Sequence, residues 1–185
     1  MVTKFNYDID YKVLDKKMVY QGKRISVEEL HYYNKRKKQI IYREHVHAGN
    51  AVIIMPITDN NEFIMIREPR TPIGKNVLAF PAGMIEIGEN SNDAALRELE
   101  EEIGYKAGCI KKLREVYPAI GYSDEKVTIY IASKLIKTQT HFDETEDIEV
   151  VKVKINDVKE MIKNNDINTS SELIALFHYF MYINK

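Results

Sequence analysis

Three closely spaced glutamates, Glu98, Glu101 and Glu102, have the side chains and the spacing best suited to chemistry. On a helix with about 100° between residues, Glu101 and Glu102 lie about 60° and 40° to either side of Glu98. Carboxylates that share one helix face in this way repel one another. A divalent cation relieves that repulsion, and ligands that are all oxygen atoms suit Mg²⁺ or Mn²⁺ better than zinc. The three glutamates alone leave open a second interpretation, an acidic face that water and Arg97 stabilise.

The loop ahead of these glutamates favours a cation site over a solvated face. Gly83 and Gly88 flank a short turn of apolar and acidic residues, 84–87, and this turn leads to Glu89. Glycine permits tight turns and a close approach of the backbone to other groups. A glycine-bounded loop followed by a helix of carboxylates can therefore hold a metal ion against a phosphate group.

We expect a helix at about 92–103 to carry the glutamates. Ser91 or Asn92 can accept hydrogen bonds as its N-cap, and Gly104 supplies the stop signal. A different face of this helix should pack on a sheet through four apolar residues, Ala95, Leu96, Leu99 and Ile103.

The elements that position this helix are mostly strands. Apolar runs and alternating patterns predict strands at 13–20, 25–33, 39–47, 51–58, 62–67, 77–80, 110–117, 126–133 and 148–153. Residues 69–74 are expected to form a loop, and two further helices are expected at 156–164 and 170–183. Strands mixed with one central and two terminal helices indicate a mixed α/β sandwich.

The composition limits the class of protein. The 185 residues include 27 basic and 28 acidic residues and are 44% hydrophobic, enough for one medium domain or one domain with a small appendage. The near-neutral charge argues against a nucleic-acid or membrane-surface protein, and the basic run 34–38 is interpreted as a solvated hairpin tip. The single cysteine, Cys109, excludes an internal disulfide and fits a reducing compartment. Because no signal peptide or membrane-spanning run is visible, we expect a soluble, cytoplasmic protein.

Residues 83–105 resemble the signature of the Nudix hydrolase superfamily. That signature is Gly, five residues, Glu, seven residues, and then Arg-Glu-apolar-any-Glu-Glu-any-Gly-apolar, and it fits without a gap. The matching residues are Gly83, Glu89, Arg97, Glu98, Leu99, Glu101, Glu102 and Gly104, with Tyr105 a loose fit at the last position. The resemblance implies an α/β/α sandwich with a mixed sheet, which hydrolyses nucleoside diphosphates linked to another moiety with Mg²⁺ or Mn²⁺.

The resemblance also implies roles for individual residues. Glu98 and Glu102 would be direct metal ligands, and Glu101 would be a further or water-mediated ligand that also belongs to the catalytic set. Arg97 would orient a glutamate through an ion pair. The carbonyl group of Ala82, just before the signature, would complete the metal shell.

A general base is still required, because the water that attacks phosphorus must lose a proton. The acidic segment 141–150 could be a solvated loop if it stood alone. It resembles the catalytic loop of the ADP-ribose pyrophosphatase branch, however, and on that match Glu144 would be the base and Glu146 an additional metal ligand.

Segments outside the signature resemble the same branch. Tyr42-Arg43-Glu44 is similar to the family's Arg-Glu pair at the adenosine diphosphate pocket, so Arg43 and Glu44 would bind substrate. Arg70, near the end of a strand, would meet the substrate phosphates. Glu125 closes a loop similar to the family's Gly-Phe-Ser-Asp-Glu sequence and would also contact substrate.

The same resemblance predicts the domain organisation. Residues 1–47 are similar to the dimerising, partly swapped N-terminal segment of these enzymes, and residues 48–185 would form the Nudix hydrolase domain. The predicted protein is a homodimer. It would bind a small nucleotide-sugar substrate, and it is not expected to bind a nucleic acid or a membrane.

The leading substrate is ADP-ribose, cleaved to AMP and ribose 5-phosphate. At three places the sequence differs from the pattern of this branch, and these differences leave other substrates possible. Ile120 stands where a proline is usual, Ala79 replaces a common glutamate, and Lys23 and Arg24 follow Gly22 where an aromatic residue is expected. The alternatives are a Nudix hydrolase of GDP-sugars or dinucleoside polyphosphates, and a non-catalytic module that senses a nucleotide.

Overall fold

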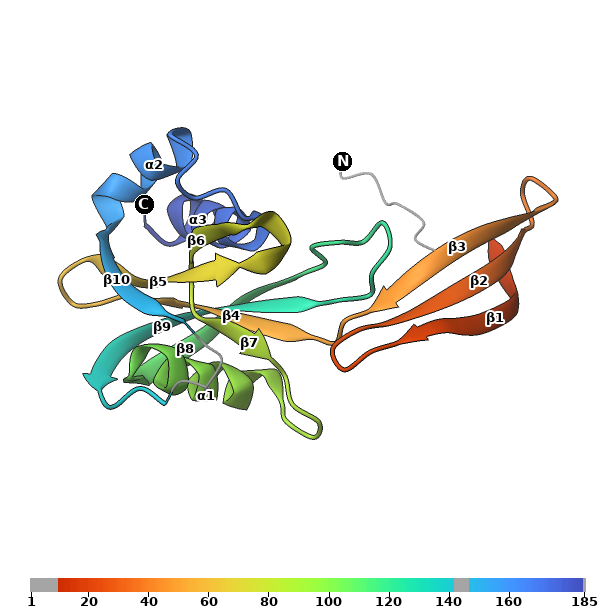
Figure 1. The fold of residues 1–185 in the computed structure, drawn as a ribbon. Coiled ribbons are helices and arrows are strands. Elements are labelled where there is room, and N and C mark those ends of the chain that lie inside the picture. The colour runs from red at the N-terminus through yellow and green to blue at the C-terminus, as the bar shows by residue number, and fades with distance from the viewer. Residues whose placement is uncertain (1–9, 142–146, 185) are drawn as a thin grey trace. The chain divides into compact units, whose positions relative to one another are not determined.

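The computed structural model describes residues 10–141 and 147–184, which cluster into two units (Figure 1). Of the described residues, 10–49 and 119–125 form the first unit, and 50–118, 126–141 and 147–184 form the second. Residues 119–125 thus join the first unit, although they follow the carboxylate helix in the sequence.

The first unit contains a three-stranded antiparallel sheet in the order β1-β2-β3. Its strands are β1 (Tyr11–Gln21), β2 (Ser26–Asn34) and β3 (Gln39–His47). The basic run 34–38 forms the turn between β2 and β3, where Asn34 pairs with Gln39, so the predicted hairpin tip is confirmed.

The second unit contains two sheets and three α-helices. The first sheet has the order β7-β4-β9-β8, and the second has the order β10-β5-β6. Because β4 pairs with β9 in parallel and the remaining pairs are antiparallel, the first sheet is mixed. The strands are β4 (Ala51–Pro56), β5 (Glu62–Arg70), β6 (Lys75–Ala79), β7 (Ala82–Met84), β8 (Tyr105–Val116), β9 (Val127–Lys137) and β10 (Glu149–Lys154); the helices are α1 (Ser91–Ile103), α2 (Ile155–Lys163) and α3 (Ser170–Tyr182).

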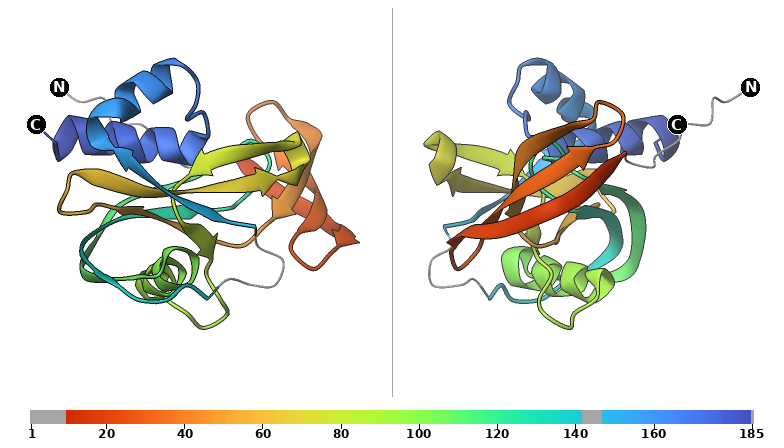
Figure 2. Two further views of the ribbon diagram at one scale, coloured as in Figure 1. Left: turned by 60° about the vertical axis from the view of Figure 1, so that its left-hand side comes forward. Right: turned by 90° about the vertical axis from the view of Figure 1, so that its right-hand side faces the viewer.

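Apolar residues on both faces of β4 and β5 explain why helices cover both sides of these sheets. Val52 and Ile54 of β4 belong to one buried cluster together with Ala94, Ala95, Leu99 and Ile103 of α1. Ile53 and Met55, which point to the other face, belong to a second cluster with Val158 of α2 and Leu176 of α3. The result is an α/β/α arrangement, with α1 on one side and α2 and α3 on the other (Figure 2). The predicted fold class is therefore confirmed.

Helix α1 begins one residue earlier than predicted, and its N-cap is neither Ser91 nor Asn92. Asn90 is the cap, because its Oδ1 accepts hydrogen bonds from the backbone N–H groups of Asn92 and Asp93, both at 3.0 Å. The packing face also differs in one residue. Ala94 is fully buried, whereas Leu96, which was expected on that face, is half-buried.

Several strand limits also differ from the sequence prediction. Residues 69–74 are not a plain loop, because β5 continues to Arg70 and a 3₁₀ turn, η1 (Thr71–Ile73), follows before Gly74. Strand β8 begins at Tyr105, directly after the helix, instead of at residue 110. The short strand β7 was not predicted, since Pro81 and Gly83 have little strand propensity.

No helix among the described residues is long and apolar enough to span a bilayer.

The N-cap of α1 can be tested by the substitution Asn90→Ala, which removes the acceptor of two backbone hydrogen bonds. We expect the free energy of unfolding, measured by chemical denaturation, to fall by about 1 kcal/mol. Asn92→Ala is the matched control, because Asn92 is exposed and takes part in this cap only through its backbone N–H group. Equal stability losses in the two variants would contradict the assignment of the cap.

Candidate active site

Helix α1 places the signature carboxylates at two depths. Glu98 and Glu102 are buried, with 8% and 4% of their surface exposed, while 40% of the Glu101 side chain is exposed. The helix ends at Gly104, which adopts a left-handed conformation (φ 69°) and donates its backbone N–H group to the carbonyl of Glu100 at 2.9 Å. The buried pair thus lies against the core side of the helix, and Glu101 lies nearer to solvent.

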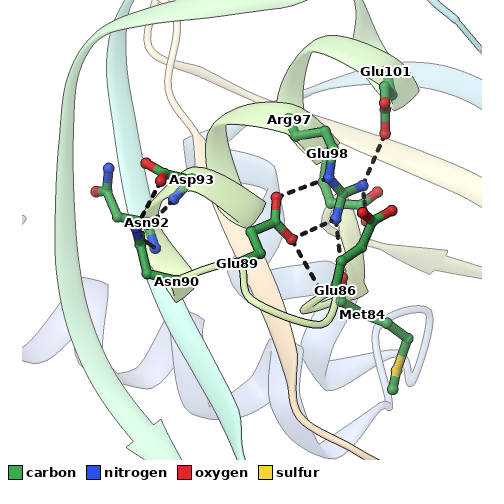
Figure 3. Close-up of polar contacts among 9 residues, drawn as sticks. All are labelled: Met84, Glu86, Glu89, Asn90, Asn92, Asp93, Arg97, Glu98 and Glu101. Atoms are coloured by element: carbon green, nitrogen blue, oxygen red, sulfur yellow. Dashed lines mark hydrogen bonds and ion pairs between the residues drawn. The ribbon is translucent and has the colours of Figure 1, made fainter.

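Arg97 lies among three carboxylates and joins the helix to the preceding loop (Figure 3). Its Nε and Nη2 atoms donate to the two oxygens of Glu89 at 3.0 and 3.1 Å. Its Nη1 atom donates to Glu98 Oε1 at 2.8 Å and to Glu101 Oε2 at 3.0 Å. Nη2 also donates to the carbonyl of Met84 at 3.0 Å. One guanidinium group therefore binds both the helix and the loop.

These contacts keep Arg97 and Glu89 charged. The hydrogen bonds from Arg97 hold the pKa of Glu89 below its usual range, against the opposing effect of burial, and the backbone N–H group of Glu86 adds to this. The hydrogen bond to Glu89 is also the main reason that the pKa of Arg97 is raised, with contributions from Glu98 and Glu101. A charged guanidinium thus persists among the carboxylates at any physiological pH.

Strand β7 approaches the buried carboxylates closely. A Cβ atom on Gly83 would lie 1.8 Å from Glu98 Oε1, so only glycine leaves room for the carboxylate in this position. The neighbouring residue, Ala82, donates its backbone N–H group to Glu102 Oε2 at 2.9 Å. The backbone of β7 and the side chains of α1 therefore form one site. The metal contact predicted for the Ala82 carbonyl stays a prediction.

The donor set suits a hard divalent cation. The site offers buried carboxylate oxygens, and a single guanidinium group faces three of the glutamates. Within residues 10–141 and 147–184, however, no three His, Cys, Asp or Glu side chains already converge on a common ion position. Glu98 and Glu101 instead direct oxygens to Arg97, and Glu146, the further predicted ligand, lies outside the described residues.

The predicted base, Glu144, also lies outside the described residues. The chain just ahead of it is bound to the end of the carboxylate helix. The backbone N–H group of Thr138 donates to the carbonyl of Gly104 at 2.7 Å, and that of His141 donates to the carbonyl of Glu101 at 2.9 Å. Residues 138–141 therefore lie beside the C-terminal end of α1.

Arg70 lies in the second unit and is exposed. It forms an ion pair with Glu68 of the same strand and helps to line an open cavity of about 330 Å³ at the end of β5. Lys75 also lines this cavity, so two basic residues border it. This arrangement can attract an anionic group such as a phosphate.

The other three predicted substrate-binding residues belong to the first unit. Arg43 and Glu44 are exposed on β3, where Arg43 Nη1 donates to the carbonyl of Tyr42 at 2.7 Å. Glu125 is half-buried at the end of segment 119–125, and burial raises the pKa of its carboxyl group. This segment is attached to β3, because the backbone N–H group of Val46 donates to the carbonyl of Tyr122 at 2.8 Å.

Two features escaped the sequence interpretation. Glu89 was recognised as part of the signature, but its two-oxygen contact with Arg97 was not foreseen. The contact between His47 and Asp124 spans 77 residues, so no local pattern pointed to it.

Comparisons with known proteins agree with this fold and geometry. The family model of the NUDIX domain matches residues 47–177. The ADP-ribose pyrophosphatase of Bacillus subtilis (strain 168) is 30% identical over 172 residues, which are 91% of each chain. The ADP compounds hydrolase NudE of Escherichia coli (strain K12) is 32% identical over 127 residues, which are 69% of this chain and 68% of that protein. A crystal structure of an ADP compounds hydrolase matches with a TM-score of 0.86 at 25% identity and covers 97% of both chains.

The chain therefore belongs to the Nudix family. It is a Nudix hydrolase that is similar to ADP-ribose pyrophosphatases, as the signature predicted. The non-catalytic alternative is not supported.

The close approach at Gly83 generates a test. Gly83→Ala should push the Glu98 carboxylate aside, because the new methyl group would overlap it. A displacement of about 1 Å can cost about 100-fold in rate, so we expect a loss of hydrolysis of that order. The melting temperature should change little, since the displaced atoms are the mobile end of a side chain.

Gly121→Ala is the matched control, because a Cβ atom there would meet nothing within 4 Å. Wild-type activity of Gly83→Ala would show that the position of Glu98 is unimportant for the reaction.

Proposed function

We propose that this protein hydrolyses the pyrophosphate bond of ADP-ribose with Mg²⁺ or Mn²⁺, giving AMP and ribose 5-phosphate. The observation that carries the proposal is the buried pair Glu98 and Glu102, held between β7 and Arg97. The names of the relatives, ADP-ribose pyrophosphatase and ADP compounds hydrolase, support the class of substrate.

The carboxylates of Glu98, Glu101 and Glu102 would hold the cation. The carbonyl group of Ala82 and the carboxylate of Glu146 would complete the set. When bound, the ion offsets the charge of the phosphates and assists formation of the attacking hydroxide. Arg97 donates to one oxygen of Glu98 and to one oxygen of Glu101, and these hydrogen bonds keep the two carboxylates close together on the helix.

Glu144 would take the proton from the attacking water. The water oxygen forms a new bond to one phosphorus atom while the bond from that atom to the bridging oxygen breaks. The bridging oxygen leaves with the other phosphate, so one ADP-ribose and one water give one AMP and one ribose 5-phosphate.

Four residues outside the signature would bind the substrate. Arg70 supplies a positive charge for the phosphates, because its guanidinium group is exposed beside an open cavity. Arg43, Glu44 and Glu125 supply hydrogen-bonding groups for the nucleoside or the sugar.

A panel of substrates with Mg²⁺ tests the assignment. We expect ADP-ribose to be hydrolysed faster than GDP-hexoses and dinucleoside polyphosphates, with AMP and ribose 5-phosphate as the products detected by chromatography. No turnover of ADP-ribose would refute this substrate but leave the Nudix class intact.

Glu102→Gln tests the role of the carboxylate in the same assay. The amide keeps the shape of the side chain but loses the charge, and kcat should fall by about 100-fold or more. Glu100→Gln is the matched control on the same helix, because Glu100 pairs with Lys106 at 3.2 Å and takes no part in the proposed site. Full activity of Glu102→Gln would refute the metal-ligand role.

We also infer that the protein is a homodimer that associates through the first unit. Among the described residues of that unit no helix covers the sheet, and every residue of β1 is exposed. Its exposed apolar side chains include Val13, Leu14, Met18 and Val19, each between 45% and 49% exposed. Apolar surface of this kind marks a protein interface. A second copy of the chain is the partner that fits the resemblance of residues 1–47 to a dimerising segment.

The dimer can be tested by sedimentation. We expect the mass in solution to be twice 21.6 kDa. Val19→Asp should shift the protein toward a single chain, because a buried carboxylate at the interface is costly. Lys17→Asp, which changes an exposed charged residue of the same strand, should leave the dimer intact. A wild-type mass of 21.6 kDa would contradict the inference.

A further inference from the structure

His47, the last residue of β3, lies between two carboxylates of the first unit. Its Nδ1 atom is 2.7 Å from Asp124 Oδ2, and its Nε2 atom is 3.3 Å from Glu28 Oε2. A neutral imidazole has a single N–H group and can donate to only one of these oxygens. Both contacts are satisfied as hydrogen bonds only when the ring carries two protons and a positive charge.

The backbone next to His47 connects this ion pair to Glu125. Ser123 Oγ donates to the carbonyl of Val46 at 2.9 Å and accepts a hydrogen bond from the backbone N–H group of Glu125 at 3.1 Å. Segment 119–125 is therefore held against β3 by its backbone, by one serine and by the contact between His47 and Asp124. Arg43 and Glu44 lie on the same strand, a few residues earlier.

The charges that face His47 come from each neighbouring segment. Asp124 and Glu28 are negative, and Lys16 of β1 lies 3.6 Å from Glu28 Oε1. His45 lies on the same strand, with its ring centre 6.4 Å from that of His47. The hydrogen bond to Asp124 raises the pKa of His47 above its ordinary value of 6.5, and Glu28 adds to this against the opposing effect of burial.

The direction of this shift fixes the pH dependence. A histidine whose pKa is raised by folding stabilises the folded contact fully below pH 6.5, and the stabilisation is lost as the pH rises through the raised pKa. Glu125, the other group of the segment with a shifted pKa, is raised by burial alone. The stabilisation that is lost above pH 6.5 is therefore due to the deprotonation of the His47 imidazolium.

We propose that His47 is a positioning residue that, in its protonated form, binds Asp124 and thereby fixes Glu125 relative to Arg43 and Glu44 for substrate binding. The inference rests on the proposed function, since it assigns these three residues to the substrate. We expect His47 to affect KM, whereas kcat depends on the carboxylates of Glu98, Glu101 and Glu102.

The test is the pH dependence of KM and kcat for ADP-ribose in the 185-residue protein. In the wild type, KM should rise about threefold to fivefold between pH 6 and pH 9, the range expected for a partly exposed ion pair. His47→Gln should have the higher KM at every pH, with kcat changed by less than about twofold. His47→Arg keeps a charge that does not titrate, so KM should stay low across the range.

His31→Gln is the matched control. His31 lies on β2, where its Nε2 atom is 2.9 Å from Glu29 Oε1 of the same strand, so the pH profile of this variant should follow that of the wild type. A wild-type pH profile of KM in His47→Gln would overturn the proposal.

NMR titration of the His47 ring separates this inference from the proposed function. The pKa of His47 should be lower in Asp124→Asn than in the wild type, whatever substrate the enzyme uses. An identical pKa in the two proteins would overturn the proposal even if ADP-ribose is hydrolysed. If ADP-ribose is not hydrolysed, the proposed substrate fails, and the KM series is measured with the nucleoside diphosphate sugar that the panel identifies.

Discussion

The guanidinium group of Arg97 holds together carboxylates that would otherwise repel one another. It binds Glu98 and Glu101 on the helix and both oxygens of Glu89 on the preceding loop. Its further hydrogen bond to the Met84 carbonyl fixes the loop backbone against the helix. Negative charge can be concentrated on these residues because the positive charge of Arg97 lies among them.

The core determines where that charge is concentrated. Ala94 and Ala95 are fully buried and small, so α1 can lie close to the apolar side chains of β4 and β5. This packing turns Glu98 and Glu102 toward β7, where the missing side chain of Gly83 leaves room for one carboxylate and the Ala82 N–H group binds the other. The polar site is thus positioned by apolar contacts that take no part in the chemistry.

Much of this arrangement could be predicted because it follows from local patterns. The strand at 39–47 was predicted with its observed limits, and Gly104 ends the carboxylate helix as expected, since both depend on neighbouring residues. The N-cap was missed because four polar residues in succession, from Asn90 to Asp93, can each act as a cap. The ion pair of His47 with Asp124 could not be found, because it depends on how distant segments of the chain fold together.

The first unit is discontinuous in the chain, and this affects the order in which it can fold during synthesis. Its three strands emerge from the ribosome early, but residues 119–125, which bind Val46 and His47, follow about 70 residues later. The early strands therefore lack segment 119–125 until the whole carboxylate helix has been synthesised. A fragment that ended at residue 49 would lack segment 119–125, which binds the end of β3, so the unit is completed only within the longer chain.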